Sequence, residues 1–352
     1  MWIAPKRTSF RPLFHLLFSV FCSKGAHPCA PTLPLNPMRC PVCEYPNAKP
    51  HYQMMDRFFE VSTEEFLLYR CGSCGLLFQD EEGIENRLAG FYPPGYWWQG
   101  GGRISSLEGA YREWVVRRDQ LKFVLSMFPS EGQRLLDIGC GGGTFVKVAL
   151  QAGFDAYGLE QSEEAVHIGQ SNAPGRIFPG MEQDLISRGE QFDVLTLFHA
   201  LEHMTDPFRY LKDLRKLLRR PGKVIIQVPN SASLQARLFG SRWYGLDCPR
   251  HVYNYTTFSL LHLLGRAGYR IHRVRHFSLR DNAAALVSSL FPALDTMSQR
   301  VKLLKRKGEL HSLGLSMKQG AFLALLVLAQ PLAFLESAVG RGATVTVYAT
   351  IE

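Results

Sequence analysis

A glycine-rich segment, residues 137–143 (DIGCGGG), has the residue types and spacing that point most directly to ligand binding. Glycines at positions 139, 141 and 143 allow the backbone to approach a ligand closely. The segment follows a short apolar run and precedes a run with helical spacing, so unpaired N–H groups of a helix N-terminus would face the same ligand. The segment therefore predicts a binding turn for a nucleotide-like cofactor.

A carboxylate further along the chain narrows the choice of cofactor. Glu160 ends the next apolar run, where a carboxylate can accept hydrogen bonds from both ribose hydroxyls of a nucleoside. The glycine spacing differs from the Gly-x-Gly-x-x-Gly pattern of dinucleotide sites. Asp137 would repel a phosphate but attract a ligand that carries an ammonium and a sulfonium group. These residues favour a methionine-derived nucleoside over a nicotinamide dinucleotide.

Together these motifs resemble class I S-adenosylmethionine-dependent methyltransferases, in particular the subgroup that includes the ubiquinone-biosynthesis O-methyltransferases. The resemblance covers about residues 130–280 and also rests on residues 192–207 (FDVLTLFHALEHMTDP), 220–223 (RPGK, with Lys223 in place of a second glycine) and 228–230 (VPN). It implies that Met181 and Glu182 lie beside the adenine, and that Phe198 or His199 lies near the amino-acid or sulfonium part. The expected cofactor-binding residues are Asp137, Gly139, Gly141, Gly143, Glu160, Met181, Glu182, Phe198 and His199.

Two histidines are candidate catalytic residues. His251 follows the expected fifth strand and could act as a general base, because imidazole titrates near neutral pH, but it could also position the substrate or serve the structure. His203 is the second candidate, with a structural hydrogen bond as its alternative role. Residues 199–203 also match the His-x-x-Glu-His pattern of zinc peptidases, which needs a helix, whereas here they follow a strand. A divalent ion at Glu202 and His203 stays open, because some ubiquinone-type relatives use a metal.

Four of the eight cysteines form two Cys-x-x-Cys pairs, Cys40/Cys43 and Cys71/Cys74. Four thiolates at this spacing predict a tetrahedral structural zinc site, and Gly72 and Gly75 are expected to allow the tight turns. The pattern is typical of metal binding rather than of a disulfide framework, which favours a reducing compartment. It resembles the zinc ribbon that precedes several methyltransferase domains. A closed shell of four thiolates leaves no open position, so no catalytic role is assigned to the zinc.

Strands and helices alternate from residue 133 onward, which favours a mostly parallel sheet with both faces covered. Ser162 and Asp206 are expected to cap helices, and Pro221-Gly222 is expected to turn into the fifth strand. The predicted fold class is α/β, with a Rossmann-like seven-stranded sheet, its last strand antiparallel, and a small N-terminal zinc ribbon. Strands are expected at about 134–138, 156–160, 176–178, 192–198, 223–228, 270–277 and 343–350.

The expected organisation has six parts. For the leader we favour Met38 as the working start of the protein, with a targeting segment or an ordered extension as alternatives. The aromatic segment 91–98 could line a substrate mouth or pack as a lid. The parts are a leader at 1–37, the zinc ribbon at 38–80, a linker and helix at 81–130, the cofactor-binding core at 131–281, a helical insertion at 282–340 and the last core strand at 341–352.

The net charge of +9 is concentrated in the leader and in residues 300–307, so it is weak evidence for nucleic-acid binding. The apolar run from Ala321 to Leu335, which we expect Pro331 to break, is near the lower limit for a membrane span. A buried helix pair is expected there, with peripheral membrane contact through residues 299–335 as the alternative. The expected location is the cytoplasm, or the inner face of the membrane.

The predicted activity is methyl transfer from S-adenosylmethionine to a small-molecule, sugar, lipid-linked glycan or quinone-like acceptor. One rival hypothesis is an RNA methyltransferase with a zinc ribbon, although residues 228–230 lack the Asn/Asp-Pro-Pro-aromatic run of base-amino methylases. The other rival is a catalytically silent, cofactor-binding scaffold. The sequence gives no prediction of the oligomeric state.

Overall fold

The computed structural model describes residues 38–79, 83–93, 96, 103–305 and 313–352. The chain divides into two units, Met1–Asn36 and Pro37–Glu352, and every element below belongs to the second unit. The predictions for the leader and for Trp97 and Trp98 lie outside the described residues.

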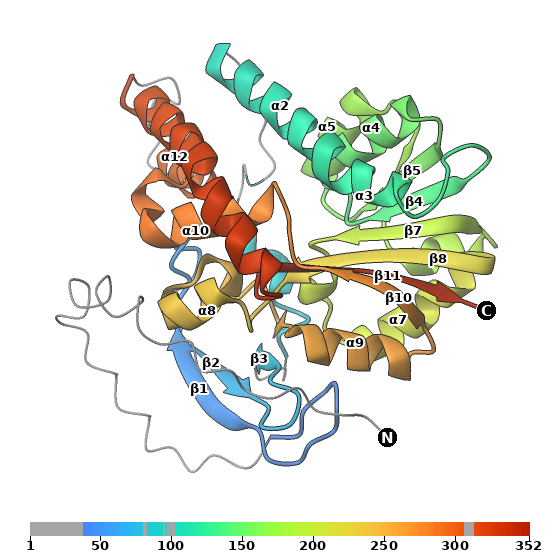
Figure 1. The fold of residues 1–352 in the computed structure, drawn as a ribbon, viewed down its shortest axis with the longest axis horizontal. Helices are drawn as coiled ribbons and strands as arrows, with labels where there is room; N and C mark the ends of the chain where they lie inside the picture. The colour runs from blue at the N-terminus through green and yellow to red at the C-terminus, as the bar shows by residue number, and fades with distance from the viewer. Residues whose placement is uncertain (1–37, 80–82, 94–95, 97–102, 306–312) are drawn as a thin grey trace. The chain divides into compact units, whose positions relative to one another are not determined.

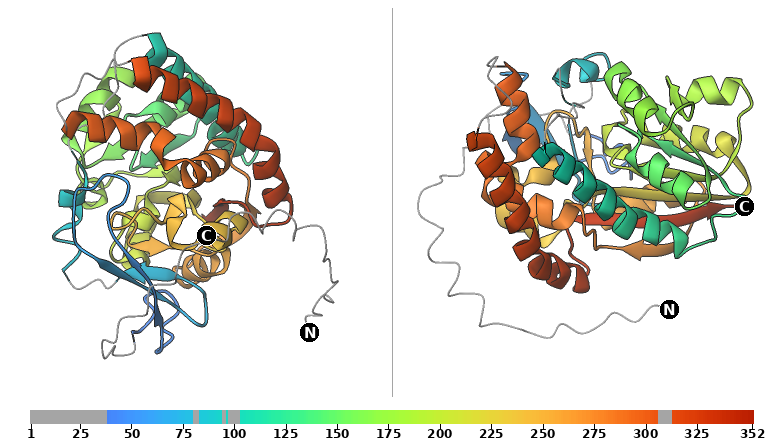
Figure 2. Two further views of the ribbon diagram at one scale, coloured as in Figure 1. Left: turned by 90° about the vertical axis from the view of Figure 1, so that its left-hand side faces the viewer. Right: turned by 90° about the horizontal axis from the view of Figure 1, so that it is seen from above.

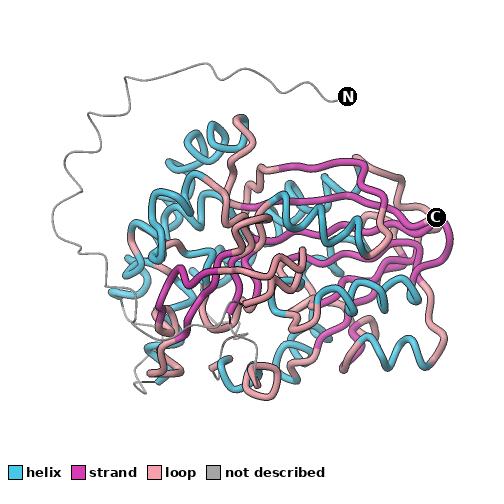
Figure 3. The backbone as a smooth tube through the Cα atoms, turned by 90° about the horizontal axis from the view of Figure 1, so that it is seen from below, coloured by secondary structure: helices cyan, strands magenta, loops and turns pink. Residues whose placement is uncertain are grey.

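A seven-stranded sheet forms the core of the second unit, with the strand order β10-β11-β8-β7-β4-β5-β6 (Figures 1 and 3). The pairs β4–β5, β4–β7, β5–β6 and β7–β8 are parallel, whereas β11 runs antiparallel to both β8 and β10. The predicted fold class is confirmed. The strands are β4 (Arg134–Ile138), β5 (Asp155–Glu160), β6 (Ile177–Pro179), β7 (Phe192–Phe198), β8 (Leu218–Pro229), β10 (Arg270–Arg275) and β11 (Thr344–Ile351).

Helices cover both faces of this sheet, with α4 and α5 on one face and α7 and α9 on the other (Figure 1). Two of the expected caps are present: Ser162 Oγ accepts from Ala165 N at 3.3 Å, and Asp206 Oδ1 accepts from Arg209 N at 3.0 Å. The helices of this part are α2 (Arg103–Val116), α3 (Lys122–Leu125), α4 (Thr144–Gln151), α5 (Glu163–Asn172), α6 (Glu182–Ser187), α7 (Pro207–Leu214), α8 (Leu234–Phe239) and α9 (Thr257–Arg266).

The expected turn at Pro221-Gly222 is an irregular segment at the start of β8, which begins at Leu218. The pairing with β7 shifts here, because β8 advances from Leu218 to Lys223 while β7 advances only from Phe192 to Val194. A Cβ atom on Gly222 would lie 2.7 Å from the Arg219 carbonyl oxygen, so only glycine fits here. The regular pairing of β8 with β7 resumes at Lys223, where the sequence predicts that the strand begins.

A second, antiparallel sheet has the order β1-β2-β3-β9. Its first three strands, β1 (Lys49–Met54), β2 (Phe66–Arg70) and β3 (Leu77–Gln79), come from the cysteine-rich segment. Its fourth strand, β9 (Tyr253–Asn254), comes from the chain that follows β8, and Phe78 pairs with Tyr253. The cysteine-rich module thus shares a sheet with the segment that carries His251.

In the described part of the segment between β10 and β11 the α-helices are α10 (Asp281–Leu290), α11 (Thr296–Lys305) and α12 (Leu313–Ala338). Figure 2 shows the long helix α12 beside α10 and α11. We expected Pro331 to break the apolar run, but α12 continues through this residue. Pro331 is exposed, so its ring is accommodated on the outer side of the helix.

Candidate functional site

The glycine-rich turn lies between β4 and α4, and its backbone has the conformation that glycine favours. Gly139, Gly141 and Gly143 have φ angles of +68°, +53° and +70°. A Cβ atom on Gly139 would lie 3.0 Å from Cβ of Ala200, which follows β7. A side chain at these positions would be strained, so the turn keeps space at the carboxyl ends of β4 and β7.

Glu160, the last residue of β5, is tied to this turn by its side chain. Its Oε2 accepts from Gly141 N at 2.8 Å, and its Oε1 accepts from Gln161 N at 2.8 Å and Ser162 N at 2.9 Å. Glu160 is buried, with 7% of its surface exposed. An ionised carboxylate has about four acceptor positions, and three of them are occupied here, so one position remains for a ribose hydroxyl.

Asp137 lies on the next strand of the sheet and is also buried. Burial raises the pKa of its carboxyl to about 7, although Thr196 Oγ1 donates a hydrogen bond of 2.7 Å to it. Nearby Glu160 adds to the rise. A cationic ligand would relieve both effects, so the two carboxylates fit a cofactor that carries an ammonium group and a sulfonium group.

The predicted adenine side is adjacent to Glu160 through the backbone. Gly180 N donates to Glu160 O at 3.0 Å, which places the start of α6 beside the end of β5. Met181 is 49% exposed, whereas Glu182 is buried and its pKa is raised by that burial. Met181 therefore offers an accessible apolar surface beside the end of β5, and its place beside the adenine stays a prediction.

Phe198 ends β7 and is a core residue in this structure. Its ring packs edge-on against Phe145 of α4, with the ring centroids 4.7 Å apart. It thereby fixes the helix that follows the glycine-rich turn.

His199 has a positive φ of 59° and a partly buried imidazole, which forms an ion pair that the sequence analysis did not predict. Its Nε2 lies 3.0 Å from Oδ2 of Asp281, the first residue of α10, and its Nδ1 lies 3.2 Å from Oε1 of Glu202. Burial alone would lower the pKa of His199, but the Asp281 and Glu202 carboxylates overcome this and raise it to about 10. The two carboxylates therefore favour the protonated form of His199, which makes it a poor candidate for a base.

A second group of titratable side chains consists of Glu202, His203 and His251, and is here called the histidine pair with Glu202. His203 Nδ1 lies 2.9 Å from the Arg250 carbonyl, and His251 Nδ1 lies 2.9 Å from the Gly245 carbonyl. Since a carbonyl only accepts, both Nδ1 atoms carry the proton and both Nε2 atoms keep a lone pair. One oxygen of Glu202, Oε2, is buried without a hydrogen-bond partner among the described residues.

This arrangement can accept a proton or hold a cation. One ligand atom from each of the three residues lies within 4.8 Å of the others. The sequence hypothesis of an ion at Glu202 and His203 thereby gains His251 as a third ligand. The peptidase alternative is excluded, because His199 follows a strand and residues 201–203 form a single 3-10 turn.

The aromatic segment after β3 lies against this group. The Tyr92 hydroxyl is 3.0 Å from His203 Nδ1, and the Tyr92 ring contacts Tyr96 with centroids 5.2 Å apart. Phe91 packs edge-on against Phe66 of β2. The described part of the segment therefore both borders the site and packs against the small sheet, so the two roles expected from the sequence coincide.

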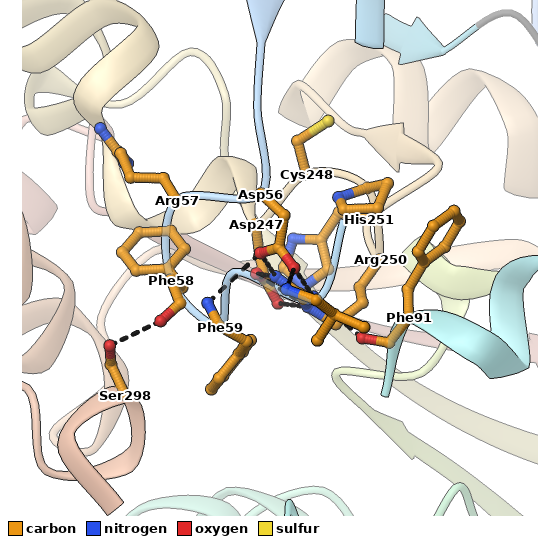
Figure 4. Close-up of polar contacts among 12 residues, drawn as sticks. Asp56, Arg57, Phe58, Phe59, Phe91, Asp247, Cys248, Arg250, His251 and Ser298 are labelled. Carbon is orange, nitrogen blue, oxygen red and sulfur yellow. Dashed lines mark hydrogen bonds and ion pairs between the residues drawn. The ribbon is translucent and has the colours of Figure 1, made fainter. Parts of the chain in front are cut away.

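Arg250 sits behind His251 at the centre of a buried ion cluster that the sequence did not reveal (Figure 4). Its Nη2 lies 2.7 Å from Asp56 Oδ1 and 2.7 Å from Asp247 Oδ1. Its Nη1 donates to Asp56 Oδ2 at 3.1 Å and to the Phe91 carbonyl at 3.0 Å, and its guanidinium lies over the Phe59 ring. The cluster ties the cysteine-rich module to the loop that carries His251. Its only signal in the sequence is a lone arginine between a proline and a histidine.

The four paired cysteines converge at one end of the small sheet. Cys40 Sγ lies 3.6 Å from Cys74 Sγ, and Cys43 Sγ lies 3.4 Å from Cys71 Sγ. Four sulfurs at about 2.3 Å from a zinc ion would form a tetrahedron with edges of about 3.8 Å. The thiols therefore lie near the spacing that zinc requires, and the four could bind this ion.

Both cysteine turns have the same backbone pattern. Gly75 has a φ of +75° after Cys74, and Glu44 has a φ of +62° after Cys43. Gly75 N donates to Cys71 O at 3.1 Å, and Glu44 N donates to Cys40 O at 2.9 Å. The expected need for glycine thus holds at position 75, whereas Gly72 lacks a positive φ and only contacts the Tyr45 ring.

Comparison with known proteins shows similarity to methyltransferases. Residues 111–274 match a family described as a methyltransferase domain. The chain is 30% identical over 151 residues to a ubiquinone biosynthesis O-methyltransferase of Cereibacter sphaeroides, covering 40% of this chain and 61% of that protein. It is 24% identical over 163 residues to the enzyme of that name from Coxiella burnetii, covering 45% of this chain and 64% of that protein. Both alignments thus span less than two thirds of the relative's length.

A solved structure described as a possible histamine N-methyltransferase of Thermotoga maritima is 18% identical, with a TM-score of 0.43, covering 71% of this chain and 98% of that chain. The chain carries a class I S-adenosylmethionine-dependent methyltransferase domain, distantly homologous to the ubiquinone O-methyltransferases. The resemblance to class I S-adenosylmethionine-dependent methyltransferases that we inferred from the sequence is therefore confirmed.

Proposed function

We propose that this protein transfers the methyl group of S-adenosylmethionine to a hydroxyl group of a small-molecule acceptor, such as a quinone precursor, a sugar or a lipid-linked glycan. The observation that carries the proposal is the histidine pair with Glu202, whose two unprotonated Nε2 atoms belong to His203, after β7, and to His251, after β8. Gly139 of the cofactor turn approaches Ala200 in the same loop. A hydroxyl acceptor needs a base, and the loop after β7 and His251 together provide one.

Different residues of this chain would bind the cofactor and transfer the proton of the acceptor. The cofactor supplies a methyl group bonded to a sulfonium, which is open to in-line attack. Glu160 and the glycine-rich turn would hold it, so that catalysis rests mainly on alignment. His251 Nε2 would take the proton of the acceptor hydroxyl as its oxygen attacks. Burial and the neighbouring His251 lower the pKa of His203 to about 4, so His203 stays neutral and is the weaker base.

The distant homologues support an oxygen acceptor of the quinone type. The relatives from Cereibacter sphaeroides and Coxiella burnetii are both ubiquinone biosynthesis O-methyltransferases. Their alignments cover only part of each protein. The proposed hydroxyl acceptor therefore rests mainly on the site of this chain, and the relatives give additional support.

Replacing His251 with asparagine should lower kcat by at least about a hundredfold, because an amide cannot accept the proton of the acceptor. The affinity for S-adenosylmethionine should stay within about twofold of wild type, since His251 is not among the cofactor-binding residues. The measurement is transfer of a radiolabelled methyl group to a panel of dihydroxyphenyl and sugar acceptors, with cofactor binding followed by calorimetry.

His262→Asn is the matched control, because His262 lies on α9 and is only partly exposed, like His251. A wild-type rate for His251→Asn would show that the base is misassigned. The same assay after treatment with a chelator distinguishes a base from a bound cation: loss of turnover that Mg²⁺ or Mn²⁺ restores would assign the three residues to a metal ion.

We also propose that Cys40, Cys43, Cys71 and Cys74 bind one structural zinc ion per chain. Hydrogen bonding from Cys74 outweighs burial and lowers the pKa of Cys40 to about 5, which favours a thiolate within the group. Cys71→Ser should abolish stoichiometric zinc and destabilise the small sheet, because metal binding and folding are coupled in such modules. Metal analysis of freshly reduced protein checks this.

Cys140→Ser, a change outside the cluster, should retain the zinc. Wild-type protein that contains no zinc when prepared under reducing conditions would contradict this proposal without affecting the proposed methyl transfer.

A further inference from the structure

Helix α12 is apolar on both of its faces, although only one face is packed. On the packed face, Phe322, Leu326, Ala329 and Ala333 form a buried cluster with residues of α10. A helix that is hydrophobic all round normally lies inside a protein core or a membrane. α12 lies at the surface, so its second face lacks the cover that its composition demands.

The exposed face of α12 contains no polar side chain between residues 320 and 340, all of which the structure describes. Contiguous apolar patches of this kind mark interaction sites rather than ordinary protein surface. The largest side chains on this face are 59–72% exposed, and they are Val327, Leu328, Leu332, Phe334, Leu335 and Val339.

Cations lie at both ends of this apolar face. Lys318 is exposed in the first turns of α12, and Arg341 is exposed just after the helix ends. Residues 317–338 of the helix span about 33 Å at 1.5 Å per residue. An apolar stripe flanked by cations matches the acyl chains and the anionic headgroups of a lipid surface. A protein partner would instead be expected to meet a polar rim along the stripe.

We propose that the exposed face of α12 docks on an anionic phospholipid membrane and lies in its interface. Residues 317–338 are long and apolar enough to cross a bilayer, with a mean hydropathy of 1.8. The packed face argues against crossing, because it carries the buried residues Gln319 and Glu336, and Glu336 Oε1 accepts from Gln235 Nε2 at 2.7 Å. One face of the helix thus packs against the protein, and the other face would contact the lipid.

The docking face is one helix away from the candidate active site. Asp281 at the start of α10 pairs with His199, and the next residue, Asn282, donates from Nδ2 to Ser337 Oγ of α12 at 2.9 Å. A membrane under α12 would therefore place the site close to acceptors dissolved in lipid or linked to it. This last consequence rests on the proposed function, whereas the docking surface does not.

Flotation of the full chain with vesicles tests the proposal directly. Wild-type protein should float with vesicles of phosphatidylcholine and phosphatidylglycerol at a 7:3 ratio, and less with pure phosphatidylcholine. The double variant Leu328→Glu/Phe334→Glu should reduce the bound fraction by about tenfold or more, because both side chains lie in the stripe. Calorimetry with S-adenosylmethionine verifies that the variant is folded.

Phe258→Glu is the matched control, because Phe258 on α9 is 61% exposed, as is Phe334. It should float like wild type. The proposal is overturned if wild-type protein stays unbound, or if Phe258→Glu loses binding to the same extent. It is also overturned if light scattering shows a wild-type dimer that ignores vesicles and that the α12 double variant converts to a monomer, since the face would then join two copies of the chain. None of these results bears on methyl transfer to a soluble acceptor.

Discussion

Replacing Arg250 with methionine is expected to lower the free energy of unfolding by about 3–5 kcal/mol. Arg250 is fully buried, and its guanidinium is bonded to the carboxylates of Asp56 and Asp247. Methionine would fill much of the volume but leave both buried carboxylates without their cation. An uncompensated buried charge is far more costly than the loss of a surface ion pair.

Urea unfolding followed by circular dichroism measures this effect. Arg209→Met is the control, because the Arg209 side chain is 80% exposed and lies 3.9 Å from Asp213, so the change should cost less than about 0.5 kcal/mol. Adding Asp56→Asn and Asp247→Asn to Arg250→Met should recover part of the loss by removing the orphaned charges. An unchanged unfolding midpoint in Arg250→Met would show that the cluster does not bind the module to the loop.

The second large effect is expected at Glu160, where alanine should raise the dissociation constant for S-adenosylmethionine at least tenfold. A charge-assisted hydrogen bond to the ribose would be lost, and such a bond contributes about 1.5–3 kcal/mol, which corresponds to tenfold or more in the dissociation constant. The fixed carboxylate also orients the glycine-rich turn through Gly141 N. Gly141→Val should weaken binding for a different reason, because a valine is strained at a φ of +53° and fills space at the turn.

Calorimetry with S-adenosylmethionine and its demethylated product is the measurement. Glu163→Ala is a suitable control, because Glu163 is an exposed residue in the first turn of α5, close to Glu160 in sequence. Wild-type affinity in Glu160→Ala would mean that the carboxylate on β5 is misassigned. Binding of NADH without any heat from S-adenosylmethionine would reject the cofactor itself.

The local features of the fold could be predicted because they depend on residues close together in the chain. The strand Arg134–Ile138 and the strand Phe192–Phe198 have the predicted bounds, and Ser162 caps α5 as expected. The glycine spacing and the paired cysteines were also informative, since each motif forms within a single turn.

The features that could not be predicted are contacts between distant segments. Asp281 would be interpreted from sequence as an ordinary acidic residue at a helix start, and only the fold places it 3.0 Å from His199. Asp56 and Arg250 are 194 residues apart, and a buried ion pair has no local pattern. Pro331 misled the prediction because a helix tolerates proline where its ring faces outward.

The shared sheet has a consequence for how the chain folds during its synthesis. Gln79 at the end of β3 donates to the Pro249 carbonyl 170 residues later, just before the strand that completes the small sheet. A ribosome adding about 5–20 residues per second needs roughly 10–30 seconds to make the intervening chain. During that interval the nascent module has an open strand edge, which is a template for pairing with other chains. Binding of the proposed zinc ion to Cys40, Cys43, Cys71 and Cys74 would stabilise the nascent module during this interval, so we expect the supply of metal to matter most while the protein is being made.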